Sequence, residues 1–399
     1  MYFVLGLVPE TLLLLPYLPN GLRFEYVVVA LLTFPCLILK KYRVNSNILL
    51  LAGCLFFSLL PLIISSAYSS ETGLYASPLD MFARLALPGV MLIFFSLIFS
   101  VRKTNFDQSI DSVVIVSSLV SGVSILSFLV PGFNNFLSPW VSGNEEGVWY
   151  QSIAVGRVVG IFNQPLEAGL FYSVALFSVI TRFWLKKSVP FGIFSLVIIV
   201  LAGVLTLSKI FLVLGIFLGF IFALVLGLIS LNRFFLIIFI LIPLVPVVGH
   251  LLAPLYVDSL IQLYDEFGLL FALTAGRLGA PSENTELYLR LLSDFNWIIG
   301  FGLGSQLPLD SGYLEYFYQG GFASFAGYLM FICCCFFYAC KKWNSIQGRL
   351  LFFLSMLLVL ASFGGPVVSA GRANIAFVLL LVVALTSDKV DCRYKREVM

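Results

Sequence analysis

The stretch GRVVGIFNQPLEAG at residues 156–169 places an arginine, two amides and a carboxylate just before an apolar run. The planar guanidinium of Arg157 suits bidentate binding of a phosphate or a carboxylate. Asn163 and Gln164 can hydrogen-bond a sugar or a phosphate, or they can simply shape the turn before the apolar run. Glu145, Glu146 and Glu167 offer carboxylates with which Arg157 can pair instead. The segment therefore predicts either an anion-binding site or a local ion pair.

Two further cations stand at the ends of apolar runs. Arg84 follows Asp80 by four residues, and this helical spacing favours an ion pair, although the same guanidinium is suited to an anionic substrate. Lys209 lies in the tight turn TLSKIF between two runs, where it either binds an anion or anchors the turn at the membrane surface. Both interpretations stay open for both residues.

A third group of charges precedes a late apolar run. Glu286, Arg290 and Asp294 are spaced i, i+4 and i+8, so a helix places all three on one face. They form either an internal ion-pair ladder or part of an anion site. Arg277 lies before this helix and Asp310 after it, where a turn or a helix cap is the alternative to a chemical role for the aspartate.

The composition defines the setting in which these residues must act. Of the 399 residues, 60% are hydrophobic and only 11% are charged, and the mean hydropathy is +1.05. A soluble domain of this length carries about a quarter charged residues. Continuous apolar runs also exclude a transmembrane barrel, whose strands alternate. We therefore expect an all-α polytopic membrane protein with about twelve transmembrane helices, each near 20 residues. The predicted spans are near 2–18, 25–39, 47–66, 80–99, 111–130, 166–183, 189–206, 210–230, 234–253, 313–338, 350–366 and 371–387.

The distribution of positive charge predicts the orientation. If both termini are cytoplasmic and the twelve runs alternate, 16 of the 23 lysines and arginines fall inside and seven fall outside. Such a bias sets the topology of membrane proteins. The seven outer cations are Arg23, Arg84, Arg157, Lys209, Arg277, Arg290 and Arg372. Six of them are arginine, and because they oppose the insertion bias, an anionic partner at the outer leaflet is expected, such as a lipid-linked diphosphate.

The chain reads as one integral membrane domain, 1–399, with two long outer segments, 131–165 and 254–312. Within the second, Asp258, Gln262, Asp265 and Glu266 recur at helical spacing opposite apolar residues, which predicts an amphipathic helix on the outer leaflet. A second helix is expected over ELYLRLLSDFNW, and the glycines of IIGFGLGSQLPLDSG then allow tight turns and close backbone approach. As a phosphate-binding loop these glycines are a weak signal, because no strand–turn–helix context surrounds them.

Neither a metal site nor a cofactor is predicted. The seven cysteines lie within spans or on the cytoplasmic side, which leaves no disulfide for the outer segments. Three of them adjoin at 333–335, but without nearby histidines they are expected to pack as small apolar residues. The single histidine, His250, ends a predicted span, and an interfacial role is the simplest one for it. No feature of the sequence predicts a nucleic-acid partner.

Three segments resemble motifs of the O-antigen polymerase and ligase superfamily. RVVGIFNQPLEA (157–168) resembles the R-x-x-G-x-F-x-x-P motif with which a span begins, and LTLSKIFLVLG (205–215) resembles a T-x-S-R hairpin with lysine at the arginine position. Residues 290–329 are similar to the R…W…GxGxG…D-x-x-Y-L…G region. The likeness covers about 150–330 by motif. It departs from the R-x10-G pattern of the polymerases, because Gly169 follows Arg157 one residue too late.

The resemblance implies a GT-C-like, metal-independent inverting glycosyltransferase in the bacterial inner membrane, with its active face periplasmic. Such a polymerase joins undecaprenyl-diphosphate-linked oligosaccharide repeat units into O-antigen or capsular polysaccharide, and the family implies a flippase and a chain-length regulator as partners. The alternatives are an O-antigen ligase, which transfers the glycan to lipid A-core, and a polysaccharide-related transporter or flippase. The ligases usually carry histidines in the large outer loop, and 254–312 has none.

For such a transfer we expect the outer cations to stabilise the leaving diphosphate. Arg157, Arg290 and Lys209 are the predicted clamp, with Arg277 assisting. A carboxylate must accept the proton of the incoming hydroxyl, and Asp310 is the first candidate and Glu286 the second. The predicted substrate-binding set also includes Asn163, Gln164, Glu167 and Arg84.

Overall fold

The computed structural model describes most of the chain. The described residues are 29, 31, 44–68, 78–102, 106–130, 132–141, 148–185, 188–233, 239, 250, 254–269, 289, 292, 297–305, 311–369 and 371–387. The spans predicted near 2–18, 25–39 and 234–253 fall almost entirely outside these residues, so a total of twelve stays a prediction.

Within the described ranges every regular element is a helix and none is a strand. The elements are α3 (Ser46–Tyr68), α4 (Pro78–Arg102), α5 (Phe106–Leu129), α6 (Phe133–Val141), α7 (Val148–Ala154), α8 (Pro165–Trp184), α9 (Val189–Leu205), the π-helix η3 (Ile210–Gly215), α10 (Ile216–Val225), α12 (Pro254–Phe267), α15 (Gly312–Lys341), α16 (Ile346–Ala361), the 3-10 helix η4 (Val367–Ser369) and α17 (Gly371–Thr386). The expectation of an all-α membrane protein is thus confirmed. The other nine predicted spans coincide with described helices.

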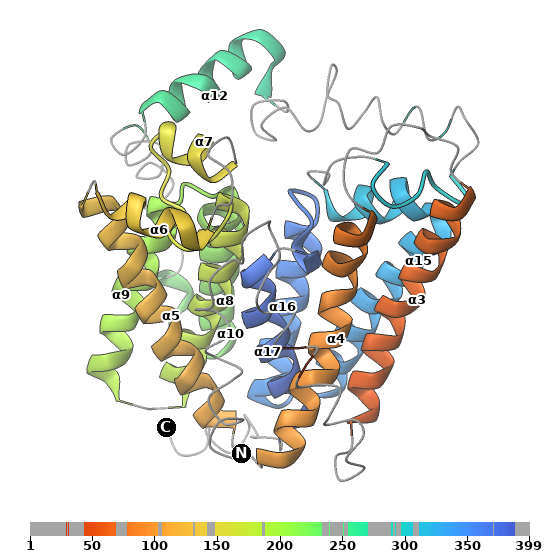
Figure 1. The fold of residues 1–399 in the computed structure, drawn as a ribbon. Helices are drawn as coiled ribbons and strands as arrows, with labels where there is room; N and C mark the ends of the chain where they lie inside the picture. The colour runs from red at the N-terminus through yellow and green to blue at the C-terminus, as the bar shows by residue number, and fades with distance from the viewer. Residues whose placement is uncertain are drawn as a thin grey trace.

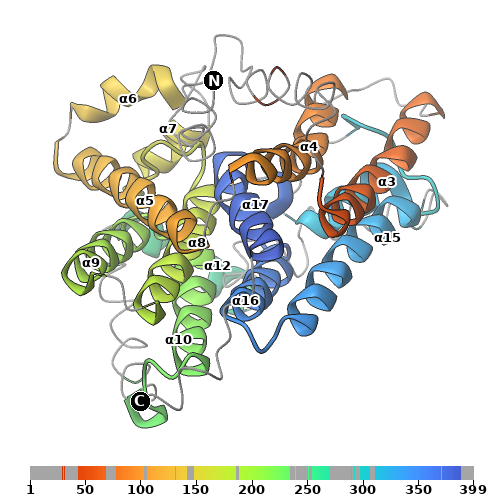
Figure 2. The same ribbon diagram turned by 90° about the horizontal axis from the view of Figure 1, so that it is seen from below.

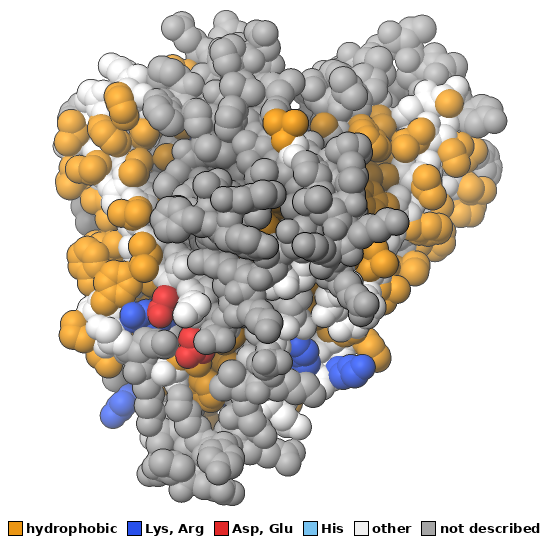
Figure 3. Space-filling model, turned by 60° about the horizontal axis from the view of Figure 1, so that its bottom comes forward, with side chains coloured by type: hydrophobic (Ala, Val, Ile, Leu, Met, Phe, Trp, Pro, Cys, Tyr) orange, Lys and Arg blue, Asp and Glu red, His pale blue; other side chains and the backbone are white. Residues whose placement is uncertain are grey.

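Five of these helices are long and apolar enough to cross a membrane, namely α3, α4, α5, α8 and α15. Four further apolar segments are shorter: α9, α16, α17 and the continuous stretch Ile210–Val225. Hydrophobic side chains cover both flanks of the molecule in Figure 3, and the described charged side chains gather toward one end in that view. This distribution is what lipid contact around a helix bundle requires.

Two of the helices form the centre of the bundle. All residues of α17 from Gly371 to Leu385 are buried, and α8 is buried over nearly its whole length. A helix that is apolar on all sides must be surrounded by other helices. Accordingly, α17 packs against α4, α8 and α16, while α3 and α15 pack together on one side and α5 and α9 on the other (Figures 1 and 2).

Hydrogen bonds between helix ends distinguish the two ends of the bundle. At one end the N–H of Gly312 donates to the carbonyl of Ser362, which joins the start of α15 to the end of α16. At the other, Lys342 donates through Nζ to the carbonyls of Ala384 and Leu385 at the end of α17. The first end lies at the top of Figure 1 and is called the rim below. Of the described cations assigned to the outside by sequence, Arg157 and Lys209 lie in the turns before α8 and η3, Arg372 is the second residue of α17, and Arg84 lies in the second turn of α4.

Helix α15 is interrupted at Gly321, whose φ of 65° and ψ of −165° are not helical. The break is held by the preceding loop, residues 297–305. The N–H groups of Phe301 and Gly302 donate to the carbonyls of Tyr318 and Gln319, and the N–H of Phe322 donates to the carbonyl of Trp297. The hydroxyl of Ser65 in α3 also donates to the Gln319 carbonyl, at 2.8 Å. The carbonyls of Tyr318 and Gln319 and the N–H of Phe322, which the break frees, are therefore satisfied, as a membrane setting demands.

The glycines of this loop and of the break have a steric purpose. A Cβ on Gly300 would lie 2.6 Å from the Gln319 carbonyl oxygen, and one on Gly321 would lie 2.2 Å from the carbonyl oxygen of Ile298. Both glycines also have positive φ, at 83° and 65°. Close backbone approach, which the sequence predicted for the loop glycines, is confirmed.

Replacing Gly321 by alanine should therefore lower the free energy of unfolding, by about 1–3 kcal/mol for the unfavourable φ alone, with the backbone contact adding to it. The matched control is Gly53→Ala in α3, where a Cβ meets nothing within 4 Å. A mid-helix glycine-to-alanine change in open space is expected to be neutral or stabilising by up to about 1 kcal/mol. Thermal unfolding of both variants in detergent measures the difference, and equal stabilities would contradict the steric account.

Candidate functional site

The first group of predicted site residues lies at the rim, in the turn that leads into α8. Gln164 is the N-cap residue, extended at φ −151° and ψ 155°, and Pro165 occupies the first helical turn, where a missing N–H has no cost. The N–H of Asn163 donates to Oε2 of Glu167 at 3.1 Å. The Asn-Gln-Pro segment thus starts the helix at the rim end of the bundle.

Arg157 stands just before this turn and is held in a defined orientation. Its Nε donates to the carbonyl of Thr206 and its Nη2 to the carbonyl of Leu207, each at 3.2 Å. Its guanidinium carbon also lies 4.7 Å from the ring centroid of Tyr256 in α12. Backbone carbonyls and an aromatic face together restrict the rotation of a side chain that is otherwise flexible.

The partner of Arg157 is the tight hairpin between α9 and η3. The backbone of Leu207 has a φ of 49°, the one positive value among described non-glycine residues. The Thr206 hydroxyl donates to the Gly203 carbonyl and accepts from the N–H of Ser208, which closes the turn. Lys209 follows, is half-buried and is the N-cap residue of the π-helix. The hairpin thus carries a lysine beside the carbonyls that hold Arg157.

Glu167 joins the starts of two central helices. It is almost fully buried, and its Oε1 accepts the backbone N–H of Arg372 while Oε2 binds the turn before α8. The buried guanidinium of Arg372 in turn donates to the carbonyl of Ile161. A carboxylate at the N-termini of two helices is favoured by both helix dipoles. Glu167, predicted as a substrate-binding residue, thus accepts hydrogen bonds from two backbone N–H groups of the protein. The described contacts of Arg157 are with the hairpin and Tyr256, not with Glu167.

Arg84 forms an ion pair between distant parts of the chain. Its Nη2 lies 2.9 Å from Oε1 of Glu315 in the first turn of α15, and the glutamate is fully buried. The sequence pointed to Asp80 as the partner, since helical spacing reveals only neighbours within one helix. The pair that the structure adds connects α4 to the part of α15 that precedes the break.

The four remaining predicted site residues, Arg277, Glu286, Arg290 and Asp310, lie outside the described residues. Of the predicted set, the structure therefore brings together Arg157 and Lys209 through the hairpin, with Asn163, Gln164 and Glu167 in the adjoining turn. Arg84 belongs to a second polar group around α15.

Sequence reasoning missed several buried polar residues at the rim. Glu315, Tyr316 and Gln319 share the inner face of the first half of α15, and Asn374 lies one turn into α17. The side-chain polar atoms of Tyr316, Gln319 and Asn374 have no hydrogen-bond partner among the described residues. An unsatisfied buried group costs about 1–3 kcal/mol. The available signal was the presence of glutamate, glutamine and asparagine inside apolar runs, where polar residues are functional by default.

Comparison with known proteins assigns no family to the chain. No family model matches it, and no curated protein does. The resemblance to the O-antigen polymerase and ligase superfamily therefore depends on the motifs themselves and on where they lie in the fold.

Proposed function

We propose that this chain is a membrane glycosyltransferase that polymerises polyprenyl-diphosphate-linked oligosaccharide repeat units into O-antigen or capsular polysaccharide. It acts at the outer face of the bacterial inner membrane, with the rim outward and both termini cytoplasmic. The substrate is undecaprenyl-diphosphate-linked, and a flippase and a chain-length regulator act beside it.

One observation carries this proposal. The first motif, 157–168, and the second, 205–215, are in direct contact, because Arg157 donates to the carbonyls of Thr206 and Leu207. The described parts of the third motif, 297–305 and 311–329, lie at the same end of the bundle. Three motifs that are far apart in sequence thus share one end, which is what a common site for a substrate arriving from the lipid requires.

In the proposed reaction an acceptor sugar hydroxyl attacks the anomeric carbon of the donor glycan. The bond from that carbon to the diphosphate oxygen breaks, the configuration inverts and polyprenyl diphosphate leaves. Arg157 and Lys209, with Arg290 and Arg277, stabilise the charge that develops on the diphosphate. Asp310, or else Glu286, accepts the hydroxyl proton.

A transporter is the alternative from another class, and the broken helix α15 is the observation that favours it. Transporters use unwound backbone carbonyls to bind their coupling ions. Here the carbonyl of Gln319 accepts both Gly302 N–H and the Ser65 hydroxyl, and the carbonyl of Tyr318 accepts Phe301 N–H. These carbonyls bind the protein itself, so the break supports a fixed site better than a gated one.

Deletion of the gene in its host distinguishes the candidates. Electrophoresis of surface polysaccharide should show a single repeat unit in place of a ladder. Complementation with the wild-type gene should restore the ladder, and so should the Gly53→Ala gene, whose product is expected to fold normally. An unchanged ladder would contradict the proposal. A carrier-linked ladder that never reaches lipid A-core would instead identify a ligase, and repeat units retained at the cytoplasmic face would identify a flippase.

A further inference from the structure

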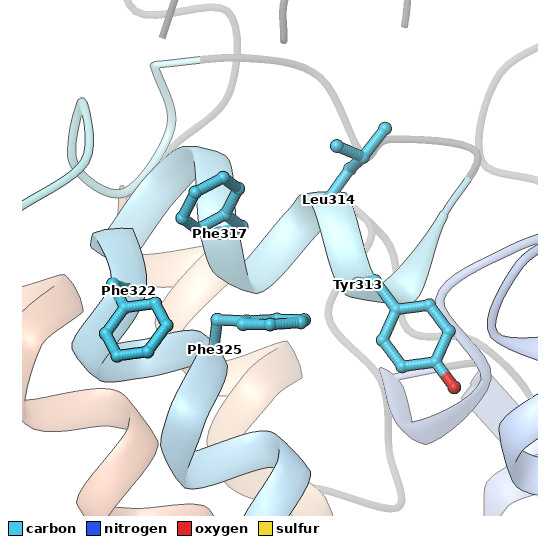
Figure 4. A pocket seen from close by; sticks show the side chains of 5 residues that line it. All are labelled: Tyr313, Leu314, Phe317, Phe322 and Phe325. Carbon is cyan, nitrogen blue, oxygen red and sulfur yellow. The ribbon is translucent and has the colours of Figure 1, made fainter. Parts of the chain in front are cut away.

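The break in α15 creates a pocket at the rim. Its volume is about 280 Å³, and its walls come from both halves of the helix (Figure 4). The lining residues are Tyr313, Leu314, Phe317, Phe322 and Phe325. In an unbroken helix the side chains at 322 and 325 would continue a straight stripe. The turn at Gly321 instead sets their rings opposite those of the first half.

The lining of the pocket is apolar, and its single polar side-chain atom is engaged within the protein. The rings of Phe317 and Phe325 are 5.6 Å apart, and that of Tyr313 lies 6.2 Å from Phe325. The one polar side-chain atom in the lining, the Tyr313 hydroxyl, donates to the carbonyl of Val359 at 2.9 Å. Because its proton is used within the protein, the lining favours a hydrocarbon over a sugar or a phosphate.

The pocket continues a lipid-facing stripe of α15. Phe322 is 55% exposed, and below it Leu329, Met330 and Phe337 are exposed on the same face of the helix. Above it, the N–H of Phe322 donates to the carbonyl of Trp297, in a loop that also exposes Ile298. Tryptophan marks the membrane–water interface. The pocket thus lies where the lipid-facing surface meets the polar rim.

This position defines the occupant as an amphiphile. Its apolar part must reach the pocket from the bilayer, while its head lies at the rim. The proposed function makes that head a diphosphate, and among the described rim cations Arg84 contacts the first half of α15, through Glu315. A volume just below the range of about 300–1,000 Å³ for small-molecule sites admits only a short segment of a chain.

We infer that this pocket binds the isoprenoid chain of a polyprenyl diphosphate, at the units nearest the diphosphate. The inference rests on the proposed function, which supplies the substrate class, and adds where its lipid is held. Methyl-branched, unsaturated isoprenoid units are wider than a saturated acyl chain and present flat faces to the four rings. Seating the chain at the start of α15 keeps the diphosphate at the rim and away from the acyl region.

Photolabelling of the full-length protein in phosphatidylcholine nanodiscs tests the inference. The probe is a polyprenyl phosphate with a benzophenone close to its head group. Mass spectrometry should locate the label within 311–325, and unlabelled polyprenyl phosphate should abolish it while the same concentration of phosphatidylglycerol does not. Labelling confined to other segments, or equal competition by the phospholipid, would overturn the inference.

Variants complete the test without depending on activity. Phe322→Ala should raise the probe concentration for half-maximal labelling roughly tenfold, which corresponds to a lost contact of about 1.4 kcal/mol. Because Phe322 is largely exposed, its truncation leaves no internal cavity, and Phe325→Trp, which fills the pocket, should act in the same direction. Phe337→Ala, on the same stripe at the other end of α15, is the matched control and should label as wild type. Equal labelling of all variants would refute the pocket.

The outcomes separate this inference from the function on which it rests. If deletion of the gene abolishes the surface polymer but the photolabel lies outside 311–325, the isoprenoid pocket is refuted and the glycosyltransferase proposal stands. If the photolabel lies within 311–325 but deletion of the gene leaves the surface polymer unchanged, the isoprenoid pocket is supported and the polymerase proposal is refuted.

Discussion

Replacing Arg157 by alanine should reduce repeat-unit polymerisation about 100- to 1,000-fold, the loss that follows removal of one preorganised donor from a developing anion. The geometry explains why this side chain is suited to the task. Bonds to the carbonyls of Thr206 and Leu207 and the ring of Tyr256 fix its orientation before any ligand arrives. A donor that needs no reorganisation contributes most in the transition state. In cells complemented with the variant, electrophoresis should show single repeat units at normal protein levels.

Two comparisons distinguish binding of the diphosphate from support of the turn. Arg157→Lys keeps the charge but cannot reach both carbonyls and stack on the ring, so an intermediate loss of polymer is expected. Arg233→Ala removes an exposed arginine at the end of the bundle opposite the rim and should leave chain length unchanged. A full-length ladder from a stable Arg157→Ala protein would refute the clamp. Lowered protein levels with normal polymer per molecule would show that Arg157 only supports the hairpin.

The helices could be predicted from sequence because lipid imposes a length and a composition on each of them. The predicted span 47–66 matches α3, and 189–206 matches α9. The same reasoning could not foresee the π-helix at 210–215 or the break at Gly321. Both depend on what packs against the helix: a Cβ on Gly215 would lie 2.3 Å from the Ser173 hydroxyl oxygen, and one on Gly321 would meet the loop.

The site was predictable in its residue types more than in its pairings. An arginine outside the membrane signals an anionic partner, but the sequence alone cannot say whether the partner is a ligand or a carboxylate elsewhere in the chain. Helical spacing predicts pairs within one helix only, so it indicated Asp80 as a partner for Arg84 and could not indicate Glu315, which lies in another helix. Glu167 was noticed because it lies at the start of a predicted span, yet its contact with the N-terminus of α17 depends on a helix late in the chain.

Breaking the ion pair of Arg84 and Glu315 should lower the free energy of unfolding substantially. Removing one member leaves the other charge buried, which costs about 3–5 kcal/mol. The glutamate is fully buried and the arginine 15% exposed, so Arg84→Ala should fall near the lower end of that range. The matched control is Asp111→Asn at the opposite end of the bundle. Its carboxylate is 30% exposed, the asparagine oxygen can still accept from Nε of Arg182, and Arg182 keeps its bond to the Ser188 carbonyl, so a smaller loss than that of Arg84→Ala is expected.

A double variant tests whether the ion pair only stabilises the fold or Arg84 also binds substrate. Arg84→Met combined with Glu315→Met buries no charge and should recover most of the stability lost by Arg84→Ala, because well-packed apolar side chains often replace a buried pair at no net cost. If the pair serves only to hold α4 against the first half of α15, the double variant should also polymerise normally. If Arg84 binds substrate, which is one of the two interpretations that the sequence left open, the double variant should be stable and inactive. A double variant no more stable than Arg84→Ala would contradict the unpaired charge of Glu315 as the cause of the loss.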